Sequence, residues 1–237
     1  MADPRGRHQR VAARSARGVP AEGPVLTPYR VLRPALPRSF YERPAVEVAR
    51  DLLGRDLVRT HPHGDVAARL VECEAYRVDD PASHSFRGRT ARTEVMFGPP
   101  GHLYVYLSYG VHWCMNVVTG REGEGSAVLL RAAEPLDGQS LMRSRRGLTN
   151  ERLLCAGPGR LCQAFGVDRG HNGLDLTANG ELLLTAGEPV GDERIAAGPR
   201  VGISVAVEQP WRFVVAGNPF VSRGHVRPGR GRRLGPG

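Results

Sequence analysis

The chain has 237 residues, of which 41% are hydrophobic, so it can bury one sizeable core but not two independent ones. Its net charge of +9 suggests an anionic partner, yet the excess lies at the ends, since residues 1–18 hold five arginines and one aspartate and residues 223–237 hold five arginines and no acid. No run of residues is apolar enough for a signal peptide or a membrane span, which excludes an integral membrane protein.

The two ends differ in composition from the rest of the chain. Residues 1–27 and 223–237 are rich in Arg, Gly and Pro and poor in large apolar residues, so we expect disordered basic arms on either side of one folded domain at 28–222. The arms could add nonspecific affinity for phosphates, or they could be extensions that only aid solubility.

The first predicted elements are a helix and a hairpin. Residues 44–53 begin with a proline, carry apolar residues at helical spacing and end before Gly54, which predicts a short helix. Strands are predicted at 55–60 and 66–76, joined by a turn-rich segment at 61–65. The two histidines of that segment are expected to face solvent, because no third metal ligand lies nearby in the sequence.

A long irregular connection follows at 77–101. It contains three prolines and several glycines, and loops of this length in compact domains are usually functional or disordered. Its aromatic and arginine residues favour function. Strands are then predicted at 102–108 and 111–118 around Tyr109-Gly110, which makes a tight, protruding hairpin.

The remaining elements complete an α+β pattern. Further strands are predicted at 127–132, 181–185, 200–207 and 211–215, with helices at 137–146 and around residues 157–159. We therefore expect a single domain with a mixed, mostly antiparallel β-sheet, peripheral helices and a protruding β-hairpin.

The basic and thiol residues limit the chemistry. All 33 basic residues are arginines, so no side-chain amine can form a Schiff base, and hydrolysis by an activated water is favoured. The four cysteines show no C-x-x-C pair and no zinc-like histidine spacing, which predicts no metal and no cofactor. Cys73 and Cys114 alternate within apolar strands and are expected to be small core residues of a protein in a reducing cytosol.

Two arginine clusters within the neutral middle of the chain are candidate phosphate contacts. They are Arg87, Arg89 and Arg92 in the long connection, and Arg143, Arg145 and Arg146 in a predicted helix.

Two glutamates share a strand face with an aromatic residue. Alternation in the sequence VECEA at 71–75 places Glu72 and Glu74 on one face and the apolar residues on the other. Exposed carboxylates on a solvated strand face are the commoner explanation of such a pattern. However, Tyr76 is next on the same face and His84 follows soon after, so an acid and stacking groups would share one wall.

Aromatic residues are concentrated in the same region. The chain has six Tyr, six Phe and two Trp, and seven of these fourteen residues lie between Tyr76 and Trp113. Tyr104 and Tyr106 share a face of the predicted hairpin, whereas Tyr109 lies at its turn, where no core can bury it. Such a wedge suits insertion between base pairs when a nucleotide is rotated out of the stack. Taken singly, each tyrosine is also compatible with an ordinary strand aromatic.

The motifs in this region occur in a distinctive order. E-x-E-A-Y and M-F-x-x-P-G-x-L-Y-V-Y-x-x-Y-G are followed by VLLRAAEPL at 128–136, LCAGPGRLCQAFG at 154–166 and RVG at 200–202. Together they span most of residues 40–222 and resemble the alkyladenine (3-methyladenine) DNA glycosylases of the methylpurine type. One departure is Thr93, which stands where many members of that family have Asn after the R-T-x-R motif.

The resemblance implies a DNA glycosylase, and the lack of lysine favours a monofunctional one; we expect a monomer in the bacterial cytosol or nucleoid. It would hydrolyse the N-glycosidic bond of alkylated or deaminated purines in double-stranded DNA and leave an abasic site, without a cofactor or a membrane. By resemblance the catalytic positions are Glu74 as general base, with Arg131 and the Val201 backbone beside the attacking water. The base-binding positions are Tyr76, His84, Tyr106 and Asn116, the last of which rejects the amine of normal guanine. Tyr109 is the intercalating residue, and Tyr104, Arg87, Arg89 and Arg92 are further expected DNA contacts.

Two other functions fit parts of the pattern. Glu72 and Glu74 would lie about 6.6 Å apart along a strand, within the roughly 6.5–9.5 Å of an inverting glycosidase pair that acts on carbohydrate. That function would leave the hairpin wedge and the arginine loop unused. A noncatalytic module that binds damaged nucleic acid would use the aromatics and arginines, with Glu74 merely structural. Replacing Glu74 by Gln separates these possibilities.

Overall fold

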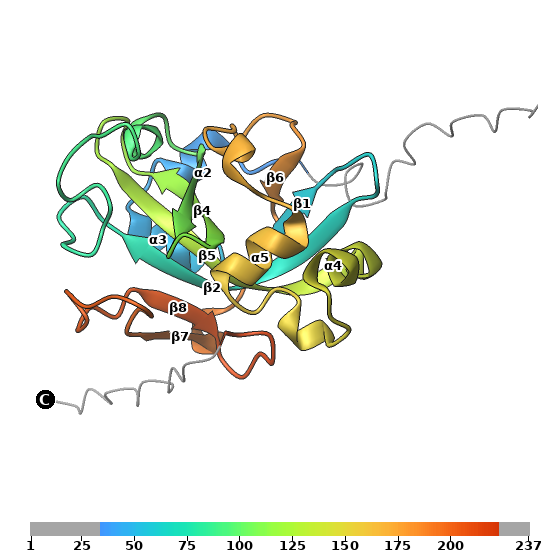
Figure 1. Ribbon diagram of the computed structural model, residues 1–237. Coiled ribbons are helices and arrows are strands. Elements are labelled where there is room, and N and C mark those ends of the chain that lie inside the picture. Colours follow the sequence, from blue (N-terminus) through green and yellow to red (C-terminus); the bar gives the residue numbers. More distant parts are fainter. Residues whose placement is uncertain (1–33, 223–237) are drawn as a thin grey trace, which may run out of the picture.

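Eight strands form one sheet in the computed structural model, which describes residues 34–222. The order is β3-β4-β5-β2-β1-β6, with β8 added to β2 and β7 added to β8 (Figure 1). Every strand pairing in this range is antiparallel, so the predicted α+β domain is confirmed, but the sheet is not mixed. The arms predicted at 1–27 and 223–237 lie outside the described residues.

The strands differ greatly in length. They are β1 (Asp56–Arg59), β2 (Val66–Tyr76), β3 (Leu103–Ser108), β4 (His112–Thr119), β5 (Ser126–Asp137), β6 (Leu182–Thr185), β7 (Ile195–Gly198) and β8 (Arg212–Val215). The long pair β2–β5 is buried along most of its length on both faces, because both strands consist mainly of apolar residues and their Glu72, Glu74 and Arg131 pair with one another inside the protein. One edge of β2 pairs first with β1 and then, from Glu72 to Glu74, with β8.

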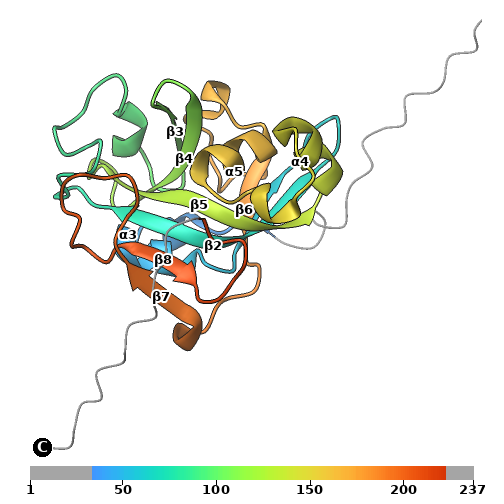
Figure 2. The same cartoon turned by 60° about the horizontal axis from the view of Figure 1, so that its bottom comes forward.

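Short helices cover both sides of this pair. They are α2 (Arg38–Tyr41), α3 (Ala45–Asp51), α4 (Gln139–Arg146) and α5 (Pro158–Phe165), with 3₁₀ helices at Glu94–Phe97, Glu151–Leu153, Arg169–His171 and Asp192–Arg194. Figure 2 shows α5 and α3 on opposite sides of β2–β5, with the β7–β8 hairpin on the side of α3. Among residues 34–222, no helix is long and apolar enough to cross a membrane.

A small apolar cluster orders the long connection 77–101. Its buried members are Met96, Phe97, Tyr104, Val118 and Ala127, which come from the connection and from β3, β4 and β5. The connection is therefore fixed against the hairpin, and it forms one wall of the pocket described below.

The second arginine cluster serves the fold. Arg145 donates to the Ala164 carbonyl at 3.0 Å, at the end of α5, where a cation complements the helix dipole. Arg146 donates to the Leu154 carbonyl at 3.1 Å. The backbone thus engages part of each guanidinium group, and phosphate binding by this cluster stays a prediction.

One predicted strand is absent and one strand was missed. Alternating valines predicted a strand at 200–207, but the chain turns there, with positive φ angles of 78° at Gly202 and 50° at Ala206. The missed strand, β7, consists of Ile-Ala-Ala-Gly, whose small residues carry little strand signal. The other predicted strands and helices are confirmed within a few residues at their ends.

Candidate functional site

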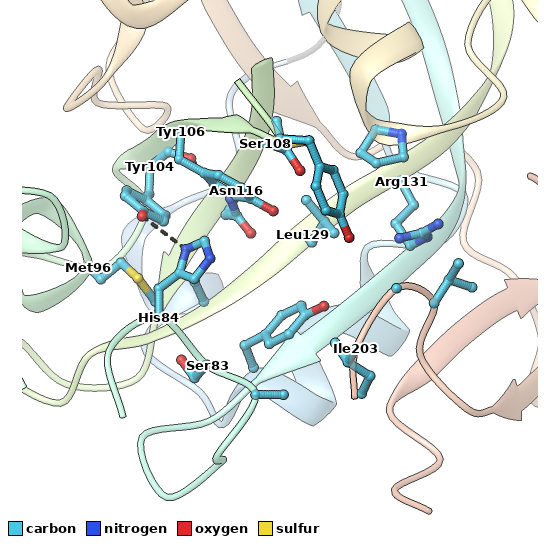
Figure 3. A pocket seen from close by; sticks show the side chains of 18 of the residues that line it. Ser83, His84, Met96, Tyr104, Tyr106, Ser108, Asn116, Leu129, Arg131 and Ile203 are labelled. Atoms are coloured by element: carbon cyan, nitrogen blue, oxygen red, sulfur yellow. Dashed lines mark hydrogen bonds between the residues drawn. The ribbon is translucent and has the colours of Figure 1, made fainter. Parts of the chain in front are cut away.

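A pocket of about 640 Å³ opens between the β3–β4 hairpin, the connection 77–101 and the loop that follows β7. Its lining includes Tyr76, Ser83, His84, Met96, Tyr104, Tyr106, Asn116, Leu129, Arg131 and residues 201–205. In Figure 3, His84 and Met96 lie at one end of the pocket and Arg131 and Ile203 at the other. Sites for small organic ligands commonly span roughly 300–1,000 Å³, so the pocket has room for a nucleobase.

Glu74 lies directly behind this lining. The residue is 0% exposed, and it is held by three donors that belong to pocket-lining residues. Tyr76 Oη and Arg131 Nη1 donate to Oε2 at 3.0 and 3.3 Å, and the Val201 N–H donates to Oε1 at 2.8 Å. Burial raises the pKa of Glu74, and the three donors offset only part of that effect.

Glu72 is satisfied by the protein itself. Its Oε1 accepts hydrogen bonds from Arg131 Nε at 2.9 Å, Arg212 Nε at 2.8 Å and Ser222 Oγ at 2.9 Å, and its Oε2 accepts one from the Ser222 N–H at 2.7 Å. Although burial alone would raise it, these partners hold the pKa of Glu72 below its usual value. Both oxygens of Glu72 are thus occupied by protein donors, and two of its three partner residues, Arg212 and Ser222, lie outside the pocket lining, so the geometry argues against an inverting pair with Glu74.

A β-bulge aims Arg131 at both carboxylates. The register of β2 and β5 shifts on either side of Glu72, so that Ala132 pairs with Glu72 and Leu130 pairs with Cys73. Arg131 falls within this irregularity, and bulges commonly redirect side chains next to active sites. Its guanidinium bridges the two glutamates, with a side chain that is only 8% exposed.

The predicted stacking residues meet in the pocket. The His84 ring is edge-on to Tyr106 with centroids 4.5 Å apart, and its Nδ1 lies 3.1 Å from the Tyr104 hydroxyl (Figure 3). Burial lowers the pKa of His84 to about 4, so the imidazole is neutral near pH 7. Tyr104 is 1% exposed and lines the pocket, where its hydroxyl supports His84, and its contact with DNA stays a prediction.

Asn116 also lines the pocket. It lies on β4, is 5% exposed, and donates through Nδ2 to the Tyr104 carbonyl at 3.2 Å. This bond fixes the amide plane against the hairpin backbone. Among residues 34–222, no three His, Cys, Asp or Glu side chains gather in a way that could hold a metal ion.

Tyr109 protrudes at the tip of the hairpin. It is 87% exposed, which agrees with the expectation that no core buries it, and it also borders the pocket. Three residues, 109–111, connect the strands, and the Val111 N–H donates to the Ser108 carbonyl at 3.1 Å across a turn in which the φ of Tyr109, 50°, and of Gly110, 72°, are both positive, as in a type I′ turn. A large aromatic residue in this left-handed conformation is unfavourable for the turn itself.

The three arginines of the connection have different environments. Arg92 borders the pocket, with its guanidinium 5.6 Å from the centre of the Tyr106 ring. Arg89 pairs with Glu94 at 3.0 Å, which occupies part of its charge. Arg87 is exposed and pairs with no carboxylate of residues 34–222. Arg87 and Arg92 are thus better placed than Arg89 to meet a phosphate.

Thr93 organises the same loop. Its hydroxyl accepts a hydrogen bond from the Thr90 N–H at 2.9 Å and donates to the Gly88 carbonyl at 3.3 Å. Thr93 is 3% exposed, so its side chain closes the loop from within.

A buried ion pair near the site was missed by the sequence reasoning. The side chains of Asp80 and Arg200 are both 0% exposed and bind each other. Arg200 also lies 4.7 Å from the centre of the Tyr76 ring. The only signals in the sequence were an acidic pair after a strand and the arginine of the RVG motif, which are separated by more than a hundred residues.

The sequence of this chain is similar to those of known proteins over most of its length. The family model of methylpurine-DNA glycosylase matches residues 39–219. A protein of Nitrosospira multiformis is 48% identical over 192 residues, which cover 81% of this chain and 96% of the relative. Others from Rhodopseudomonas palustris strain BisB18 and Streptomyces avermitilis are 53% and 49% identical, over 81% and 85% of this chain and 92% and 97% of their own length. All three carry the name "Putative 3-methyladenine DNA glycosylase".

Proposed function

Since this chain belongs to the methylpurine-DNA glycosylase family, we propose that it releases alkylated or deaminated purines from double-stranded DNA, with Glu74 as the general base. As a member of that family it is a base-excision-repair hydrolase of N-glycosidic bonds. The observation that carries the finer proposal is the place of Glu74, behind an aromatic pocket and between Arg131 and the Val201 N–H.

The pocket suits a flipped purine. Tyr76 and Tyr106 are placed to stack on the base, and the neutral His84 supplies a ring nitrogen for hydrogen bonding. An N-alkylated purine is cationic, and the face of an aromatic ring attracts a desolvated cation by up to about 2 kcal/mol. Undamaged bases lack that attraction, so it favours damaged ones.

The chemistry needs one ionised carboxylate. Departure of the purine leaves an oxocarbenium-like sugar, which Glu74 stabilises while it accepts a proton from the attacking water. Arg131 favours the carboxylate form of Glu74 against the effect of burial. The chain has no lysine to form a Schiff base, so the product is an abasic site in an intact strand.

The hairpin tip provides the contact with the duplex. Tyr109 would fill the gap left by the flipped nucleotide, and Arg87 and Arg92 would bind phosphates beside it. We further propose that the enzyme acts as a monomer in the cytosol or nucleoid, where its DNA substrate lies.

One observation favours a second candidate, a noncatalytic module that binds damaged DNA, because Glu74 has no exposed surface. The test is release of free base from duplexes that carry one hypoxanthine or one methylated purine, with an undamaged duplex as control. The proposed enzyme releases the base and leaves the strand uncut. Binding of the lesion duplex without release would favour the module.

A further inference from the structure

The Asp80–Arg200 pair is rigidly held behind the pocket. Both carboxylate oxygens of Asp80 accept hydrogen bonds from the guanidinium, and Arg200 Nη1 also donates to the Ala75 carbonyl at 2.9 Å. Burying two charges is costly unless their geometry is good, and here the two terminal nitrogens carry all the bonds, since Arg200 Nε is buried without a hydrogen-bond partner among residues 34–222. With three such bonds on its two terminal nitrogens, the guanidinium is restricted to one orientation.

That orientation places the guanidinium between two aromatic rings. Its carbon lies 4.7 Å from the centre of Tyr76 and 5.1 Å from the centre of Trp211. A cation over an aromatic face is attracted by the ring, and more strongly where water is excluded. The Tyr76 ring is therefore supported by a fixed cation while its hydroxyl donates to Glu74 at 3.0 Å.

The same arginine also fixes the second donor of Glu74. Val201 follows Arg200 directly in the chain, and its N–H reaches the other carboxylate oxygen at 2.8 Å. The loop around it has little support of its own, since Val201 is exposed and Gly202 has a positive φ of 78°. Anchoring Arg200 to Asp80 and Ala75 therefore anchors the Val201 amide as well.

We propose that the Asp80–Arg200 pair is a positioning unit of the active site, which holds the Tyr76 hydroxyl and the Val201 N–H on the two oxygens of Glu74. This inference rests on the proposed role of Glu74 as general base. Tyr76 then both stacks on the base and donates a hydrogen bond to Glu74. Asp80 and Arg200 act as positioning residues that do not contact the substrate.

The consequence is a pH dependence that the pair controls. The charged and titratable groups around Glu74 are Arg131 on β5, Glu72, Cys73 and Tyr76 on β2, Tyr106 on β3, and Arg212, its register partner on β8. Burial raises the pKa of Glu74, whereas the Val201 and Tyr76 hydrogen bonds lower it. Loss of either bond raises it further. Because excision needs the carboxylate, activity falls as the pH drops through this pKa, and the acid limb moves to higher pH.

The experiment measures single-turnover excision of hypoxanthine as a function of pH. Tyr76→Phe keeps the stacking ring and removes only the hydroxyl, and Asp80→Asn removes the charge that orients Arg200. A hydrogen bond worth about 1 kcal/mol corresponds to a shift of roughly half to one pH unit. We expect the acid limb to move up by that amount in both variants. In the double variant it should move no further than in Asp80→Asn, because without the pair the Tyr76 hydroxyl has already lost its position on Glu74.

Two controls separate positioning from general stability. Asp56 is also a buried carboxylate with an arginine partner, Arg69 at 2.9 Å, but it lies on β1 and does not line the pocket. Asp56→Asn should lower the melting temperature and leave the acid limb in place. Tyr106→Phe removes a hydroxyl that makes no hydrogen bond to Glu74, so it should lower the excision rate through base binding and leave the acid limb in place.

The outcomes distinguish this inference from the proposed function. Unmoved acid limbs in Tyr76→Phe and Asp80→Asn, beside an active wild type, would overturn the inference alone. An equal shift in Asp56→Asn would overturn it too. If Asp80→Asn does not fold, Arg200→Lys, which keeps the charge but not the paired hydrogen bonds to Asp80, takes its place, and an unmoved acid limb there would overturn the inference. Wild-type protein that releases no base would refute the proposed function and the inference with it.

Discussion

Replacing Tyr109 by Asn should make the protein more stable and less active. The hairpin turn has positive φ at Tyr109 and Gly110, and Asn-Gly is the preferred sequence for such a turn. Tyr109 is 87% exposed, so its removal takes almost no packing from the folded state. Tyr109 destabilises the turn and adds no packing to the core, so we expect its side chain to act through contact with DNA.

The substitution should raise the free energy of unfolding and lower the rate of excision. A side chain with a Cβ in the left-handed region costs about 1–2 kcal/mol, and Asn tolerates that region better, so we expect the free energy of unfolding to rise by about 0.5–1 kcal/mol. In a domain of this size that raises the melting temperature by about 2–4 °C per kcal/mol. Loss of stacking on a neighbouring base costs about 1–3 kcal/mol, or roughly 5- to 150-fold in kcat/KM for excision.

The assay compares excision from a lesion duplex, affinity for an undamaged duplex and thermal unfolding. Affinity for undamaged DNA should fall much less than excision, because it depends mainly on arginine contacts with phosphates. Tyr109→Trp keeps an aromatic wedge and serves as the matched control. Wild-type excision by Tyr109→Asn, or equal fold losses in excision and in undamaged-duplex binding, would refute the wedge role.

Three further predictions concern the stability of the charged core, the residue that titrates in excision and the reaction mechanism. Glu72→Ala leaves Arg212 buried without a carboxylate and Arg131 with Glu74 alone, and it should lower the free energy of unfolding by about 3–5 kcal/mol in urea titrations; an unchanged midpoint would contradict the structural role of Glu72. His84 is neutral above about pH 5, since its pKa is about 4, so His84→Asn should keep the acid limb of excision where it is; its loss would identify His84 as the titrating group. Borohydride should trap no covalent complex with DNA, because the chain lacks lysine, and a trapped complex would exclude simple hydrolysis.

Local patterns were sufficient to predict most of the sheet and the pocket wall. The alternation around Glu74, the turn at Tyr109-Gly110 and the apolar runs on either side act over a few residues, which is the range that sequence periodicity describes. Tyr76 and Glu74 are two residues apart on one strand, so their contact follows from the strand itself.

Features that depend on distant parts of the chain could not be predicted. Asp80 and Arg200 meet across 120 residues, and nothing in the sequence around either shows that both are fully buried. The hydrogen bonds that saturate Glu72 come partly from Ser222, which is 150 residues away in the sequence. The burial of Tyr104 likewise depends on Met96 and Phe97, which close over it from the long connection. Strand periodicity correctly placed Glu72 and Glu74 on one face, but only tertiary contacts distinguish a saturated carboxylate from a general base.

The most direct test of the central claim compares Glu74→Gln with Glu72→Gln in single-turnover base release from a lesion duplex. Gln has the shape of Glu but cannot accept the proton from water. We expect Glu74→Gln to bind the lesion duplex and to lose about 10²–10⁴-fold in rate, while folded Glu72→Gln retains most of its activity. Release at the wild-type rate by Glu74→Gln, or a larger loss in Glu72→Gln, would contradict the assignment of Glu74 as the general base.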